Sequence, residues 1–248
     1  MRESIQIKFS RTNYKLIYIF LFIVAFFSLP IYLILTKLDM GNTIVYILLS
    51  FSMWFILLIF FVKDLVTFRK IGGTLFIVFF MITNSISAYY LINIALTTDN
   101  KIFGIIILSF IGIFYGSFLW DFFISVKYSK YYTREYQTNL LEVISRYPIE
   151  KGIVYINQND SLQINIKEKC RKIYSYIAGA FFIPFALLGK VAAYFLVLGI
   201  SQYYSSHTFI IASILFPGTL FFIIKNIPHL ISVWKLKYPL EKQIDIKK

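Results

Sequence analysis

The chain has 248 residues, of which 58% are hydrophobic, 20% aromatic and only 15% charged, and its formal net charge is +13. Soluble domains contain roughly one half apolar and one quarter charged residues, so this composition excludes an ordinary soluble globular domain. The single cysteine, Cys170, also excludes an intrachain disulfide framework.

Long apolar runs recur along the chain, and a run of about 18 residues can cross the roughly 30 Å hydrocarbon core of a bilayer as a helix. We therefore predict an all-α polytopic membrane protein with about six transmembrane helices. The run after Lys15 is too long for a cleavable signal peptide and indicates an uncleaved signal anchor. The predicted spans are 16–36, 44–62, 74–96, 102–125, 173–198 and 207–225.

The basic residues gather on one side of these spans. Of the 25 lysines and arginines, 22 fall on the side of the N-terminal segment, whereas Lys37 and Lys101 fall on the other. Because such an excess marks the cytoplasmic side, we expect both termini in the cytoplasm and the spans in a bacterial inner (plasma) membrane. The basic excess also predicts attraction to anionic lipid headgroups and makes a nucleic-acid partner an unfavourable interpretation.

The spans divide the chain into four regions. These are a four-helix transmembrane half (1–126), a cytoplasmic linker (127–172), a two-helix transmembrane half (173–225) and a basic cytoplasmic tail (226–248). Within the first half, similar polar positions in 35–51 and 96–110 are consistent with a duplicated helical hairpin or with coincidence. In the tail, we expect disorder after Pro239.

The linker contains patterns of two kinds. Segment 133–147 carries apolar residues at helical spacing and predicts a short amphipathic helix that ends at Pro148. The segments "GIVYI" and "SLQINIK" flank "NQND", and the second alternates apolar and polar residues. We therefore predict a small cytoplasmic helix plus a β-hairpin inserted between spans 4 and 5.

Few residues suit chemistry inside the membrane. Asn84, Asn93 and Asp121 are candidates for a polar path or binding site, and each has a structural alternative in helix packing or interfacial solvation. The histidines, His207 and His229, fall on opposite sides of the predicted membrane and cannot share a metal. We predict no metal site, no cofactor and no catalytic residue.

Small residues recur on two predicted helices at spacings that keep them on one helix face, which favours close helix packing. They are Gly104, Gly112 and Gly116 in the fourth span, and Gly179, Ala186 and Ala193 in the fifth.

Lys190 stands alone in the apolar run "FALLGKVAAYFLV". On a continuous fifth helix it points near the Gly179 face at a depth in the outer third of the membrane. It could extend to the outer headgroups, pair with Asp39 or Asp99, or present a charge to a partner. Alternatively, the fifth span ends near Gly189 and the following segment lies on the outer face.

These features favour a non-enzymatic membrane protein that binds another membrane protein. An assembly factor, a sensor subunit and an immunity-type protein against a membrane-acting toxin all fit, and a homo-oligomer is also open. The alternative is a small transporter or channel with a polar path near Asn84, Asn93, Asp121 and Lys190. A membrane-embedded lipid or glycan enzyme is a third class with few candidate residues.

Overall fold

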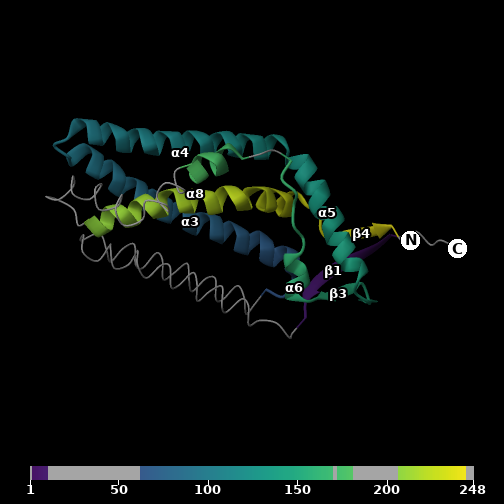
Figure 1. The fold of residues 1–248 in the computed structure, drawn as a ribbon. Helices are drawn as coiled ribbons and strands as arrows, with labels where there is room; N and C mark the ends of the chain where they lie inside the picture. Colours follow the sequence, from purple (N-terminus) through teal and green to yellow (C-terminus); the bar gives the residue numbers. More distant parts are fainter. Residues whose placement is uncertain (1, 11–61, 170–171, 181–205, 244–248) are drawn as a thin grey trace. The chain divides into compact units, whose positions relative to one another are not determined.

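The computed structural model describes residues 2–10, 62–169, 172–180 and 206–243 (Figure 1). The chain divides into two compact units. Unit 1 comprises Met1–Phe76, Tyr128–Lys167 and Pro228–Lys248, and unit 2 comprises Ile77–Lys127 and Glu168–Ile227.

Within these described ranges, three helices are long and apolar enough to cross a membrane: Leu65–Thr97, Lys101–Lys127 and Ala212–Lys235. They are α3 (Leu65–Thr97), α4 (Lys101–Lys127) and α8 (Ser206–Lys235), the three long ribbons of Figure 1. The predicted spans 74–96, 102–125 and 207–225 are thereby confirmed as parts of apolar helices. The predicted spans 16–36 and 44–62 lie outside the described residues except for Val62, and of span 173–198 only the helical residues 173–180 are described.

Helix α3 begins earlier than the apolar run because Asp64 caps it. The Oδ2 atom of Asp64 accepts a hydrogen bond from the backbone N–H of Thr67 at 2.7 Å. This bond satisfies one of the donors that the first turn of a helix leaves without a partner. The more polar residues before position 74 are therefore helical, although their composition does not mark a transmembrane span.

The predicted amphipathic helix is confirmed as α5 (Ser129–Ser145). It buries Tyr132, Tyr136, Leu140, Val143 and Ile144 at the three- and four-residue spacing of one helix face. The helix ends shortly before Pro148, where the missing N–H and the fixed φ prevent its continuation.

Unit 1 is built around a four-stranded mixed sheet in the order β2-β3-β1-β4. The central strand β1 (Arg2–Phe9) runs parallel to β3 (Ile153–Ile156) and antiparallel to β4 (Leu240–Gln243). Its Ile5 and Ile7 are buried while Ser4 and Gln6 are exposed, the period of two expected when a sheet is covered on one face. The core against this face is completed by α5, the start of α3 and the end of α8, through residues that include Leu65, Tyr136 and Val233.

The hairpin of the linker lies at a different place from the one predicted. Strand β2 (Ile149–Glu150) pairs antiparallel with β3, with Glu150 opposite Ile153. Between them, Lys151 and Gly152 both have positive φ, 50° and 74°, as a two-residue type I′ turn requires. The N–H of Gln6 donates to the Gly152 carbonyl at 2.8 Å, which connects this turn to β1.

The second predicted strand, within 161–167, does not form. Residues Gln158–Leu162 form the short helix α6, and the backbone after it bonds to side chains of α5 in place of a partner strand. Asn139 donates through Nδ2 to the Asn165 carbonyl, and Glu135 accepts the Lys167 N–H at 2.7 Å. Ile164 still enters the core, so the apolar alternation reflects burial without a strand ladder.

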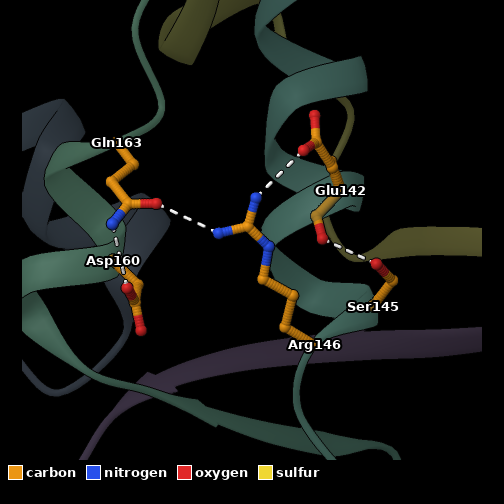
Figure 2. A network of polar contacts seen from close by, with 5 residues as sticks. All are labelled: Glu142, Ser145, Arg146, Asp160 and Gln163. Atoms are coloured by element: carbon orange, nitrogen blue, oxygen red, sulfur yellow. Dashed lines mark hydrogen bonds and ion pairs between the residues drawn. The ribbon is translucent and has the colours of Figure 1, made fainter.

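A surface network holds α6 against the end of α5 (Figure 2). Arg146 donates to the side chains of Gln163 at 3.1 Å and Glu142 at 3.0 Å, and Gln163 donates to Asp160 at 3.2 Å. Surface ion pairs such as Arg146–Glu142 contribute at most about 1 kcal/mol, so this network orients α6 more than it stabilises the unit.

The prediction of disorder after Pro239 is wrong for Leu240–Gln243. These residues form β4, in which Leu240 lies opposite Ile5 and is buried in the core of unit 1. The segment is ordered in spite of its charged composition because its backbone pairs with the edge of β1 and its leucine is buried. Pairing satisfies backbone groups that water would otherwise solvate.

Unit 2 has an aromatic core. Phe114 of α4 packs at 5.6 Å from the ring of Tyr174 and at 6.2 Å from the ring of Phe216 in α8. Tyr115 contacts Phe216 from the neighbouring position at 5.2 Å, edge to face. Such pairs contribute about 0.5–1.5 kcal/mol beyond the area they bury, and they hold α4, α8 and the segment 173–180 together.

Candidate functional site

Asn84 lies at the centre of a hydrogen-bonded cluster inside unit 2. Its Nδ2 donates to the Phe216 carbonyl at 2.8 Å and to Thr219 Oγ1 at 3.0 Å, and its Oδ1 accepts from the Tyr115 hydroxyl at 2.8 Å. The residue is only 3% exposed. One amide therefore connects α3, α4 and α8, as polar residues do when they join transmembrane helices.

Asn93, the second asparagine of α3, is half-buried. Its backbone carbonyl accepts a hydrogen bond from the Thr97 hydroxyl at 2.8 Å, one turn later in the same helix. Asn93 lies nine residues beyond Asn84 on the same helix, about 13 Å at about 1.5 Å per residue, which is too far for the two asparagine side chains to bond directly.

Asp121 caps the start of another helix. It is 2% exposed, and its two oxygens accept the backbone N–H groups of Ile173 at 3.0 Å and Tyr174 at 2.9 Å. These are the first residues of the helical segment 173–180, whose N–H groups have no intrahelical partners. A carboxylate at a helix N-terminus is also favoured by the helix dipole. Asp121 of α4 thus fixes the point at which this segment begins.

Lys172, one residue before that segment, is buried and doubly bonded. Its Nζ donates to the Ile224 carbonyl of α8 at 3.1 Å and pairs with Glu168 at 2.8 Å. Residue 228, four positions after Ile224, is a proline and supplies no N–H to that carbonyl. Lys172 therefore donates to the Ile224 carbonyl, which would otherwise lack a hydrogen-bond donor because of Pro228. In the sequence, only the position of Pro228 indicates that this carbonyl needs another donor.

The glycines of α4 occupy two kinds of environment. A Cβ atom at Gly104 would lie 2.5 Å from the Ala95 carbonyl oxygen and 3.4 Å from Thr98 Cγ2, so α4 approaches the end of α3 closely there. Gly112 and Gly116 are exposed, and no atom of the described residues lies within 4 Å of a Cβ built on either. Gly179 is half-buried, and no atom of the described residues lies within 4 Å of a Cβ built on it. Ala186 and Ala193 lie outside the described residues, as does Lys190.

Alanine at Gly104 is expected to destabilise the protein, whereas alanine at Gly112 is not. The first variant forces a backbone carbonyl to move, and overpacking of this kind costs about 1–3 kcal/mol. The second adds a methyl group that no atom of the described residues would contact and removes a glycine from a helix, a change that is neutral or stabilising by up to about 1 kcal/mol. The measurement is the apparent Tm of both variants in the same detergent, and equal values would contradict the close approach at Gly104.

Unit 1 contains a cluster that the sequence did not reveal. Arg69 of α3 lies 5.9 Å from the ring centroid of Tyr136 and donates to its hydroxyl at 3.3 Å and to the Ser161 carbonyl. The ring of His229 also packs edge to face with Tyr136, with the ring centroids 6.5 Å apart. In the sequence Arg69 is one of many basic residues, and nothing near it indicates a partner 67 residues away.

A second cluster joins three segments of unit 1 through Tyr238. The tyrosine hydroxyl donates to Asp64, the cap of α3, and accepts from the N–H of Ile7 in β1 at 3.0 Å. Burial raises the pKa of the Tyr238 hydroxyl above its ordinary value, and the neighbouring Asp64 carboxylate raises it further. Tyr238 therefore stays protonated in the folded unit at pH values where a solvated tyrosine ionises.

This raised pKa predicts alkaline destabilisation. The contribution of Tyr238 is complete below about pH 10, the ordinary tyrosine pKa, and is lost above it because only the unfolded chain then releases the proton. Tyr238→Phe should be less stable near neutral pH by at least about 1 kcal/mol, because it loses both hydrogen bonds of the hydroxyl, at about 0.5–1.5 kcal/mol each. Its apparent Tm should fall less steeply than that of the wild type above pH 10. The other tyrosines are common to both proteins, so equal slopes would contradict the prediction.

The described residues bring together no group of three or more His, Cys, Asp or Glu side chains, the groupings that hold metal ions. A scan against protein-family models found no match, and neither did searches of curated proteins and of solved structures. The described residues therefore define the class by themselves: they are mainly helical, with three helices long and apolar enough to cross a membrane, and one of their two compact units contains a small sheet.

Proposed function

We propose that this chain is a multi-pass protein of a bacterial inner membrane that acts, without catalysis, by binding another membrane protein through its transmembrane helices. The partner is a helix of an assembly, a sensor complex or a membrane-acting toxin. Six spans and a cytoplasmic position of both termini are part of this proposal, supported by the apolar runs and the one-sided distribution of basic residues.

The observation that carries the proposal is the outward face of α4. Residues such as Ile107, Phe114 and Asp121 are buried on one side of this helix, and Gly112 and Gly116 lie on the opposite side. Two glycines four residues apart let a second helix approach closely, the geometry in which lipid-embedded helices associate by packing. No atom of the described residues lies within 4 Å of a Cβ built on either glycine, which supports this face as the place where a partner helix packs.

Transport remains the alternative, and the described residues give it less support. A polar path needs groups with free hydrogen-bonding capacity, whereas Asn84 uses both polar atoms of its amide for helix contacts and Asp121 uses both oxygens for backbone N–H groups. Both residues thus have structural roles that account for their presence in apolar helices.

The test is affinity purification of the tagged full chain in mild detergent after crosslinking, with co-purifying proteins identified. Gly116→Leu blocks close approach on the outward face of α4. Ser85→Leu is the matched control, because it adds similar bulk at an exposed position of α3 whose hydroxyl bonds only within its own helix, to Met81. Lys190→Leu tests the intramembrane charge in the same assay.

We expect one specific partner to be retained by the wild type and by Ser85→Leu and lost from Gly116→Leu. Loss from Lys190→Leu as well would make that lysine a recognition charge. Purification of the wild type alone, together with solute flux in proteoliposomes that Asn84→Leu abolishes, would overturn binding in favour of transport.

A further inference from the structure

Helices α3 and α8 approach each other closely within unit 1. A Cβ atom at Gly73 would lie 3.2 Å from Leu230 Cδ1, so the glycine permits this approach. One turn further along α8, the indole N–H of Trp234 donates at 3.1 Å to Oγ1 of Thr74, the residue after Gly73, and the Thr74 hydroxyl donates to the Lys70 carbonyl at 2.8 Å. These two bonds hold the indole ring beside Lys70, whose Nζ lies 5.7 Å from the ring centroid.

The charge and the ring are both available to a ligand. Lys70 forms no ion pair with an acidic side chain among the described residues, and its ammonium lies over the indole ring. Trp234 is 55% exposed although its N–H is already satisfied. An ammonium above an exposed aromatic ring, with no carboxylate to neutralise it, attracts an anion that also carries an apolar part.

The position along the helices indicates which anion. From Lys70 to the end of α3 at Thr97 are 27 residues, about 40 Å of helix at about 1.5 Å each. This matches the roughly 40–45 Å thickness of a bilayer including its headgroup layers, which puts Lys70 at headgroup depth. Tryptophan is enriched at this same depth, and Trp234 stands beside Lys70.

The surrounding unit has the complementary charge. Residues 2–10, 62–76, 128–167 and 228–243, the described part of unit 1, contain 13 lysines and arginines against seven aspartates and glutamates. Each basic residue near an anionic membrane surface contributes about 1 kcal/mol of attraction. The excess of basic residues favours binding of unit 1 to any anionic surface. The indole of Trp234 and the ammonium of Lys70, which lie at fixed positions, define one particular site on the protein.

We propose that Lys70, Thr74 and Trp234 form a binding site for the headgroup phosphate of an anionic phospholipid at the membrane–water interface. The ammonium of Lys70 pairs with the phosphate, and the ring of Trp234 packs on the glycerol and upper acyl region. Thr74 is a positioning residue, because it acts by orienting the indole.

The test uses the full chain in nanodiscs, with Trp54→Phe and Trp120→Phe so that Trp234 is the only tryptophan. Quenching of its fluorescence by brominated phosphatidylglycerol is compared with quenching by brominated phosphatidylcholine, in this background and with Lys70→Gln added. Lys130→Gln is the matched control, an exposed lysine of the same unit on α5. Native mass spectrometry of the chain with all three tryptophans counts the lipid molecules that it retains. This second measurement tests the site even if the variant with a single tryptophan does not fold.

We expect brominated phosphatidylglycerol to quench more strongly than brominated phosphatidylcholine. Lys70→Gln should reduce this preference about five-fold, the factor that corresponds to about 1 kcal/mol for one basic residue. Lys130→Gln should leave the preference unchanged. Added inorganic phosphate should not displace the lipid. Equal quenching by both lipids, equal effects of the two lysine variants, absence of quenching, or displacement by phosphate alone would each overturn the proposal.

Discussion

Replacement of Asp121 by alanine is expected to lower the stability of the protein by about 3 kcal/mol, because each buried N–H group left without an acceptor costs about 1–3 kcal/mol. Two such groups, those of Ile173 and Tyr174, depend on this carboxylate. Asp121→Asn keeps one acceptor oxygen in place and should lose about half as much.

The measurement is the apparent Tm in detergent of the wild type, both Asp121 variants and Asp99→Asn. Asp99 is an exposed acid in the turn between α3 and α4, so its variant should melt like the wild type. An order in which Asp121→Ala is the least stable and Asp121→Asn intermediate supports the cap. Equal stability of Asp121→Ala and the wild type would mean that water or lipid headgroups replace the carboxylate.

Asn84→Leu is expected to have the second largest effect. It removes three hydrogen bonds of unit 2, to Phe216, Thr219 and Tyr115, and at an average of about 0.6 kcal/mol for each bond between transmembrane helices the loss is about 2 kcal/mol. Leucine has a similar volume, so the change reflects lost bonds more than a cavity.

A double-mutant cycle with Tyr115→Phe isolates the bond between the two side chains. The single variants share this bond, so the double variant should be less destabilised than the sum of the two by about 0.6 kcal/mol. Ser85→Ala, at an exposed position of the same helix, is the control and should leave the apparent Tm unchanged. Strict additivity would contradict the hydrogen bond between Tyr115 and Asn84.

Local patterns predicted the helical part of the described fold. Short windows of sequence contain the apolar runs of α3, α4 and α8 and the three- and four-residue spacing in α5. Each of these helices can form against lipid or against one adjacent core surface, so its pattern can be recognised locally. The start of α3 could be found only from its cap at Asp64, since the residues that follow are too polar to indicate a span.

The sheet could not be predicted in the same way. Ile5 and Ile7 form an alternation too short to distinguish from chance, and the pairing partners of β1 are almost 150 and 235 residues away. The alternation of Ile164 and Ile166 was longer but misleading, because the side chains of α5 bond the backbone that a partner strand would otherwise have bonded. Periodicity reports which side chains are buried and does not identify the backbone partner.

The same distinction between local patterns and distant partners applies to the site residues. Asp121 and Asn84 were recognisable as polar residues in apolar runs, and the structure places both in hydrogen-bonded contacts between helices. The partners Tyr115, Tyr174 and Lys172 have no such signal, because aromatic residues and juxtamembrane lysines are common throughout this sequence. Their roles depend on which helices become neighbours, and a single sequence does not contain that information.

The position of β1 in the middle of its sheet has a consequence for the order of synthesis. Ile5 leaves the ribosome 235 residues before Leu240, the residue opposite it in β4. At about 5–20 residues per second, this separation corresponds to a delay of roughly 12–50 s. During that time one edge of β1 has no strand to pair with, while the apolar helices α3, α4 and α8 are being synthesised. Completion of the sheet is therefore a late event, and unit 1 closes only after these three helices have been made.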